Sequence, residues 1–182
     1  MDSPASKFVR ARILGAPPLS GSIPEHWYDA WAECVWVHFD AGEGREWAGV
    51  FGASGVTASK VVTLFGGDRS AFVIARGQGY IIDTGSRELR HRTERECLVD
   101  AMALPGRDLV AACDSWNVFV YSSAGLVWRS DRIAVDGIRL EAAGPEELAG
   151  SCDVGDWRSF RLELGSWRLL DGPWEEWKRL QR

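Results

Sequence analysis

A segment of about forty residues recurs along the chain, and this repeat limits the folds available to it more than any other feature. Three similar segments, each a charged start followed by small and apolar residues, begin 38 and 39 residues apart: RSAFVIA (69–75), RDLVAAC (107–113) and EELAGSC (146–152). Each is followed by an apolar run, a turn containing glycine and a second run, and another apolar run precedes each. One unit is therefore predicted to contain four short strands.

The alternation of side chains favours strands over helices. In FRLEL (160–164) the apolar residues would face one side and the charged residues the other, the period of two that a strand requires. Four short strands in about forty residues match a propeller blade. Units would span 61–96, 97–136 and 137–172, with a less regular one at 31–60. The predicted fold is all-β, mainly antiparallel: a propeller-like array of three to four four-stranded units, open or closed at four blades, with an ordinary antiparallel sandwich as the alternative.

A chain of 182 residues is long enough for one well-packed core, so a single domain over 1–182 is predicted. Ser22 and Glu25 have the spacing of a capping box, which favours a short helix at 22–33. A strand is expected at 7–14. The predicted parts are 1–33 (strand, loop and short helix), 34–172 (β repeats) and 173–182 (C-terminal tail or helix).

Charge and composition exclude several classes of partner. A net charge of −5 argues against a nucleic-acid partner, since phosphate backbones require basic surfaces. No apolar run approaches the ~20 residues that span a membrane, and the N-terminus lacks the pattern of a secretory signal. We therefore expect a cytoplasmic protein without a membrane partner. Free thiols are expected because the four cysteines lie far apart: Cys34, Cys97, Cys113 and Cys152.

The sequence contains no recognisable catalytic or metal-binding motif. His26, His38 and His91 lack the spacing of metal ligands, and the chain has no phosphate-binding loop or nucleophile elbow. Aspartates recur at the predicted turns, where this residue commonly binds backbone amides. No catalytic residue, metal ligand or cofactor is therefore predicted, and a carboxylate pair in a central cleft is the basis of an enzymatic alternative.

Tryptophan is abundant, with ten in the chain. Trp128 and Trp167 lie one repeat apart and are predicted to pack between sheets. Trp157 does not fit the repeat, and Trp116 falls at a turn, so both are candidates for an exposed contact surface. The predicted partner-binding residues are Trp116, Arg129, Trp157 and Asp114.

The run GRDLVAACD…VFVYSSAGLVWRSDRIAVDGIRL (106–140), followed by DWRSFRLELGSW (156–167), resembles a group of bacterial proteins without an established activity. These share Trp-Arg-x-x-Arg, Asp-Gly and Trp-x-x-Phe patterns, and the resemblance covers residues 35–170. The rhythm of the units is also similar to that of tryptophan–aspartate and kelch-type propellers, although the signature dipeptides of those families are absent. Repeats of this kind imply a binding scaffold.

Together these features predict a non-enzymatic binding module that holds a protein partner through loops of the β scaffold, as an inhibitor or immunity-type protein would. One alternative is a small hydrolase or lyase with carboxylates in a central funnel. The other is a self-assembling structural protein, in which a homodimer forms through open sheet edges.

Overall fold

The computed structural model describes residues 9–19, 21–94 and 97–173, which form sixteen strands in four four-stranded sheets. Sheet 1 contains β1 (Arg10–Leu14), β2 (Glu25–Tyr28), β3 (Cys34–Asp40) and β4 (Glu46–Gly52). Sheet 2 contains β5 (Lys60–Phe65), β6 (Ser70–Ala75), β7 (Gln78–Asp83) and β8 (Leu89–Arg92). Sheet 3 contains β9 (Asp100–Ala103), β10 (Leu109–Cys113), β11 (Val118–Ser122) and β12 (Gly125–Arg129). Sheet 4 contains β13 (Ile138–Ala143), β14 (Glu147–Asp153), β15 (Trp157–Glu163) and β16 (Arg168–Asp171).

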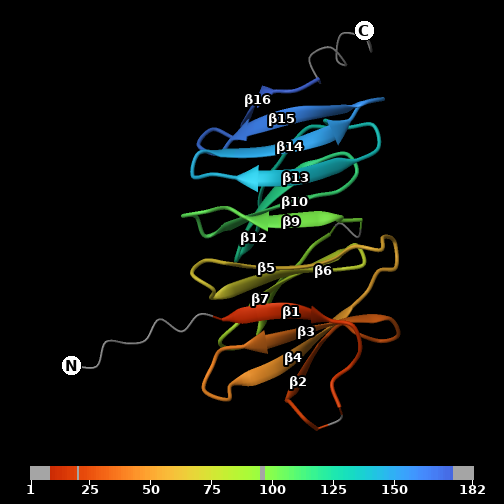
Figure 1. Ribbon diagram of the computed structural model, residues 1–182, viewed down its shortest axis with the longest axis vertical. Helices are drawn as coiled ribbons and strands as arrows, with labels where there is room; N and C mark the ends of the chain where they lie inside the picture. Colours follow the sequence, from red (N-terminus) through yellow and green to blue (C-terminus); the bar gives the residue numbers. More distant parts are fainter. Residues whose placement is uncertain (1–8, 20, 95–96, 174–182) are drawn as a thin grey trace, which may run out of the picture.

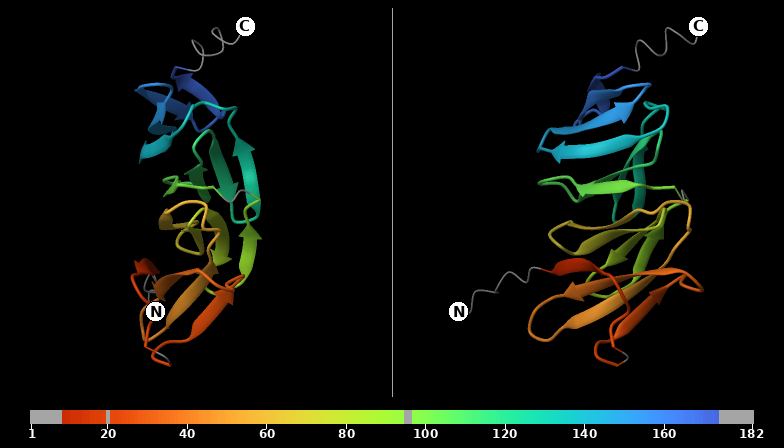
Figure 2. Two further views of the ribbon diagram at one scale, coloured as in Figure 1. Left: turned by 90° about the vertical axis from the view of Figure 1, so that its right-hand side faces the viewer. Right: turned by 45° about the vertical axis from the view of Figure 1, so that its right-hand side comes forward.

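The four sheets follow one another along the long axis of the molecule and form a curved, open array (Figures 1 and 2). The first strands β1, β5, β9 and β13 contact one another in that order, so they form the inner side of the curve. Sheets 1 and 4 lie at opposite ends (Figure 1). The prediction of an all-β, propeller-like array of four-stranded units is therefore confirmed, and the array is open.

Strand order differs between the first sheet and the others. In sheets 2, 3 and 4 the strands follow the chain from the inner to the outer edge, and all pairs are antiparallel. Sheet 1 has the order β1-β3-β4-β2, and its outer strand β2 pairs in parallel with β4. The first sheet therefore takes its outer strand from a segment that precedes its two central strands.

The predicted helix at 22–33 is wrong, because β2 occupies this segment. The carbonyl of Pro24 accepts a hydrogen bond from the Ala48 N–H at 2.8 Å and starts the pairing with β4. Tyr28 is buried and stacks on Phe51 at 4.8 Å, which fixes the strand against the core. Long-range pairing therefore overrides the local capping signal. The strand expected at 7–14 is present as β1, and the C-terminal helix proposed at 173–182 lies almost wholly outside the described residues.

Three clusters of buried apolar side chains lie between neighbouring sheets, one cluster at each junction. Phe51 and Tyr80 belong to the cluster between sheets 1 and 2, and Phe72 and Phe119 to that between sheets 2 and 3. Phe160 belongs to the cluster between sheets 3 and 4. Each sheet is thus held mainly by the face it presents to its neighbour, at roughly 25 cal/mol for each Å² of apolar surface buried.

The outer strands of sheets 2, 3 and 4 carry the same irregularity. The pairing of each outer strand with its inner neighbour shifts register by one residue, which leaves Arg90, Val127 and Leu170 as the extra residues of three β-bulges. A bulge increases the local twist of a strand. The repeat visible in the sequence therefore extends to the backbone of the outer edge.

Candidate functional site

The turn between β10 and β11 is built on Asp114, which is fully buried. Its Oδ1 atom accepts hydrogen bonds from the backbone N–H groups of Trp116 and Asn117, both at 2.7 Å. The Cys97 thiol lies 3.8 Å from Oδ2. Asp114 therefore positions the turn that presents Trp116 and lies buried beneath it, so any effect of Asp114 on a partner would act through the position of this turn.

Trp116 lies at the tip of this turn and is 39% exposed. Its indole Nε1 donates to the carbonyl of Val135 at 3.1 Å. The guanidinium of Arg132 lies over the ring, 5.8 Å from its centroid, and also donates to the Val135 carbonyl at 2.9 Å. The exposed ring is thus fixed in orientation from two directions.

Trp157 lies on the other side of the loop formed by residues 130–137, at the start of β15, and is 44% exposed. The guanidinium of Arg139 lies 3.9 Å from the centroid of its ring. The Val135 N–H donates to the carbonyl of Asp153, which pairs with Trp157, at 2.7 Å. The structure therefore brings the two predicted tryptophans to opposite sides of one loop. We call the resulting set the Trp116–Trp157 surface: Trp116, Arg132, Val135, Arg139 and Trp157.

Arg129, at the end of β12, is linked to the same turn but points elsewhere. Its Nη2 donates to Oδ1 of Asn117 at 3.1 Å, and its guanidinium lies 5.7 Å from the centroid of the Phe119 ring. Phe119 belongs to the cluster between sheets 2 and 3. Arg129 therefore lies beside the Trp116–Trp157 surface and is not part of it.

Trp128 and Trp167 pack between sheets 3 and 4, as predicted. Their rings stack with centroids 5.9 Å apart and planes inclined at 21°, against the cluster of buried residues at that junction. Trp167 lies in the turn before β16 and has a positive φ of 56°, whereas Trp128 lies within β12. The two residues thus meet in space although their backbone positions differ.

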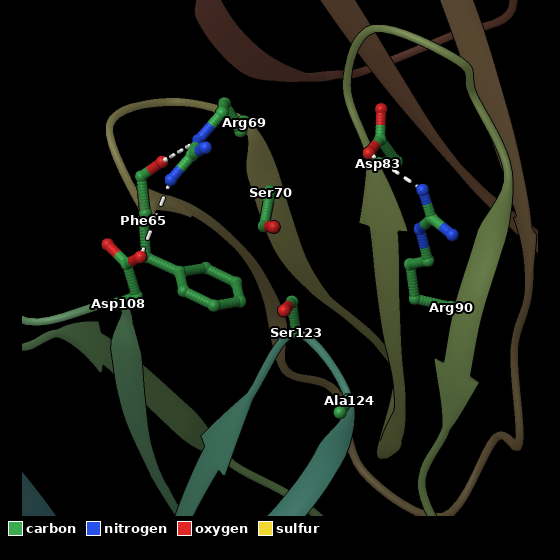
Figure 3. A pocket seen from close by; sticks show the side chains of 9 residues that line it. Phe65, Arg69, Ser70, Asp83, Arg90, Asp108, Ser123 and Ala124 are labelled. Carbon is green, nitrogen blue, oxygen red and sulfur yellow. Dashed lines mark hydrogen bonds and ion pairs between the residues drawn. The ribbon is translucent and has the colours of Figure 1, made fainter.

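A cavity of about 480 Å³ lies between sheets 2 and 3, where turns of both sheets meet (Figure 3). Arg69 pairs with Asp108 at 3.5 Å, and Arg90 pairs with Asp83 at 3.1 Å. The backbone N–H of Ser86 and the Arg90 guanidinium hold the pKa of Asp83 below its ordinary value, against the effect of burial. Both carboxylates are thus paired with an arginine, and the lowered pKa of Asp83 makes that carboxylate unsuited to donating a proton. No local sequence signal marks this cavity, because its residues come from four separate turns.

His26 and His38 each contact side chains of neighbouring strands or turns. His26 accepts a hydrogen bond from Arg87 at 2.8 Å and lies edge-on to Trp47, while His38 lies 3.0 Å from Glu46. In the part of the chain that the structure describes, no group of three or more His, Cys, Asp and Glu side chains is arranged to hold a metal ion. The same residues include no helix with the length and apolar character needed to cross a membrane.

The fold and this surface define an open, propeller-like β-repeat scaffold with tryptophan and arginine side chains presented at one end of two sheets. No protein-family model matches the sequence, and no curated protein matches it. Solved structures that resemble parts of it include two with a TM-score of 0.46: hydrazine synthase of Kuenenia stuttgartiensis (12% identity, over 60% of this chain and 33% of that one) and BamB from Moraxella catarrhalis (17% identity, over 74% and 44%). The chain therefore spans less than half of either protein, and neither likeness bears on function.

Proposed function

We propose that this chain is a non-enzymatic module that binds a protein partner through the Trp116–Trp157 surface. The observation that carries the proposal is the pair of half-exposed tryptophans, each with an arginine guanidinium over its ring. Tryptophan and arginine are enriched among the residues that dominate binding energy at protein interfaces. The Trp116 ring is held by a hydrogen bond and both rings lie against a guanidinium, so they lose little conformational freedom when a partner binds.

Several features support a protein as the partner. The net charge of −5 disfavours the phosphate backbone of a nucleic acid. The four cysteines are free, as expected for a chain that resides in the cytoplasm. A rigid surface at the end of a β scaffold would suit an inhibitor or immunity-type protein, which acts by covering part of its partner.

Quantitative capture from a native lysate tests this function. The immobilised full chain should retain a stoichiometric protein partner, and Trp116→Ala and Trp157→Ala should each reduce retention at least tenfold. Trp31→Ala is the matched control. Trp31 is 94% exposed and lies in the loop between β2 and β3 of sheet 1, away from the Trp116–Trp157 surface. Absence of a stoichiometric partner under several conditions, or equal retention by all variants, contradicts the proposal.

A second candidate function, self-assembly, is favoured by the outer face of sheet 1. Leu14, Trp36, Val50 and Trp27 form one row across its four strands, on the side turned away from sheet 2. Trp27 is exposed, and its ring meets that of Trp36 in this row. Light scattering should then show a dimer that Trp36→Arg converts to monomer, while a monomeric wild-type protein removes this candidate.

A further inference from the structure

The outer strands of sheets 2, 3 and 4 are β8, β12 and β16. They differ in how well their side chains protect the sheet edge from pairing with another chain. β8 reads Leu-Arg-His-Arg and β16 reads Arg-Leu-Leu-Asp, so both carry charged side chains, which protect exposed sheet edges. β12 reads Gly-Leu-Val-Trp-Arg, with its single charge at the last position. Leu126 and Val127 in this strand are 53% and 50% exposed. β12 is therefore the least protected of these three edges.

Cavities lie on both sides of β12. The Phe119 cavity, of about 400 Å³, lies towards sheet 2, and is lined by His91, Glu94, Phe119, Tyr121, Leu126 and Arg129. The Trp128 cavity, of about 340 Å³, lies towards sheet 4 and includes the stacked Trp128 and Trp167 rings with Arg129 and Arg132. Arg129 lines both. Successive side chains of a strand point to opposite faces of its sheet, so a strand added to β12 would direct them alternately towards these two cavities.

We propose that β12 accepts an extended peptide segment of the partner as a fifth strand of sheet 3, with alternate side chains in the Phe119 and Trp128 cavities. Main-chain pairing to a sheet edge supplies affinity in this mode, and pockets for alternate side chains supply specificity. The inference rests on the proposed function, because Arg132 belongs to both the Trp128 cavity and the Trp116–Trp157 surface. A single partner can therefore contact both the Trp128 cavity and the Trp116–Trp157 surface.

The charges around β12 define the chemistry of the segment. The contacts of the Arg129 guanidinium are with neutral groups, the Asn117 amide and the Phe119 ring, so this cation accommodates one carboxylate. Glu94 and Asp131 lie in the two cavities and disfavour further acidic residues. The remaining lining of the Phe119 cavity is mostly aromatic and aliphatic. The segment that fits is apolar, with a single acidic residue.

The bulge at Val127 limits the length of the contact. It interrupts the regular edge of β12 and leaves Trp128 and Arg129 as the paired residues beyond it. Main-chain pairing is therefore short, and side chains in the cavities contribute a large share of the affinity. The same bulge in β8 and β16 means that side chains, and not backbone geometry, distinguish β12 from the other two edges.

The test uses the full chain and a random heptapeptide library displayed on phage. Enriched peptides are synthesised, and their dissociation constants are measured by fluorescence anisotropy for wild type and three variants. Leu126→Lys adds a charge to the edge, and Arg129→Gln removes the charge but keeps a donor for Asn117. Leu89→Lys adds the same charge to β8 and is the matched control. Unfolding midpoints of all four proteins confirm that each variant is folded.

Enriched peptides are expected to be apolar with one acidic residue. Leu126→Lys and Arg129→Gln should each raise the dissociation constant at least tenfold, and Leu89→Lys should leave it unchanged. Methylation of alternate backbone nitrogens of the peptide should also weaken binding. Failure to enrich any peptide, or binding that both β12 variants retain, overturns the inference.

The lysate experiment separates this outcome from failure of the proposed function. A captured partner that depends on Trp116 and Trp157 but is retained by Leu126→Lys leaves the binding module intact and overturns the β12 site. Loss of the partner in Leu126→Lys as well as in the tryptophan variants supports both the proposed binding function and the β12 site.

Discussion

The outer faces of sheets 1 and 4 occupy equivalent places at the two ends of the array, but their chemistry differs. On sheet 4, Arg161 pairs with Asp171 and with Glu147, the latter at 3.3 Å, and Ser151 donates to Glu141 at 2.7 Å. This part of the face is covered by charges that are paired within the sheet, while Trp157 and Arg139 lie at the end of the same face. Terminal units of repeat proteins commonly have polar outer faces of this kind, which keep an end of the array soluble.

Sheet 1 retains an apolar row on the corresponding face. The Trp27 and Trp36 rings meet edge to face with centroids 5.7 Å apart, and Val50 in the same row is fully buried. Aromatic side chains of this size cover a neighbour in their own sheet and still leave surface for a partner. Much of the outer face of sheet 4 is therefore covered by its own paired charges, whereas the outer face of sheet 1 keeps an apolar row, where the proposed self-assembly would take place.

The largest expected effect tests whether the two sheets are equally well anchored on their inner faces. Phe51 in sheet 1 and Phe160 in sheet 4 are both fully buried against the adjacent sheet. Phe51→Ala and Phe160→Ala should each lower the free energy of unfolding by about 3–5 kcal/mol, through lost burial and the cavity left behind. Urea denaturation measures both. If either variant lost less than about 1 kcal/mol of unfolding free energy, its sheet would be only loosely attached to the array. Sheets 1 and 4 would then differ on their inner faces as well as on their outer faces.

A smaller effect of pH should distinguish the ends, because His26 lies in sheet 1 and sheet 4 contains no histidine. Burial, followed by the nearby charge of Arg87, lowers the pKa of His26 below its ordinary value. The unfolded chain therefore binds this proton more readily than the folded one, and stability that is present above about pH 6.5 is lost as the pH falls towards the folded pKa. Hydrogen exchange should show earlier opening of sheet 1 than of sheet 4 on acidification. His26→Gln should reduce the difference, and equal opening of both sheets would contradict the expectation.

The smallest effect concerns the ion pairs on the outer face of sheet 4. Arg161→Ala should lower the free energy of unfolding only slightly at low salt, because exposed ion pairs are solvated and screened. The cost should shrink further in 1 M salt. Thermal unfolding at two salt concentrations measures it. A larger, salt-independent loss would mean that the pairs hold the sheet together, and do more than keep its outer face polar.

The sequence predicted sheets 2 to 4 because their signals are local. Alternation within segments such as 160–164 and short turns between strands identify a hairpin without knowledge of the rest of the chain. β2 was missed because its pairing is parallel and long-range, while the spacing of Ser22 and Glu25 gave a local helix signal. Strand formation there depends on a partner that appears later in the sequence.

The candidate site was only partly predictable for a similar reason. The exposure of Trp116 and Trp157 follows from a turn position and a break in the repeat, both visible in the sequence. The burial of Asp114 and the cavities beside β12 depend on how neighbouring sheets pack, which no single segment specifies. The position of Arg129 also depends on this packing, because its guanidinium contacts Asn117 and the Phe119 ring at the junction of sheets 2 and 3.

The inner-to-outer strand order of sheets 2 to 4 also has a consequence for synthesis on the ribosome. Chains grow at about 5–20 residues per second, so one repeat takes on the order of 2–8 seconds to emerge. Hairpins form in about 1–10 microseconds, and each sheet can thus be complete long before the next begins. During that interval the face that later packs against the next sheet is exposed to solvent. In sheet 2, for example, Phe72 and Ile81 stay exposed until sheet 3 has formed. The nascent chain should therefore be most prone to aggregation and most dependent on chaperones at the boundaries between repeats, and least so within them.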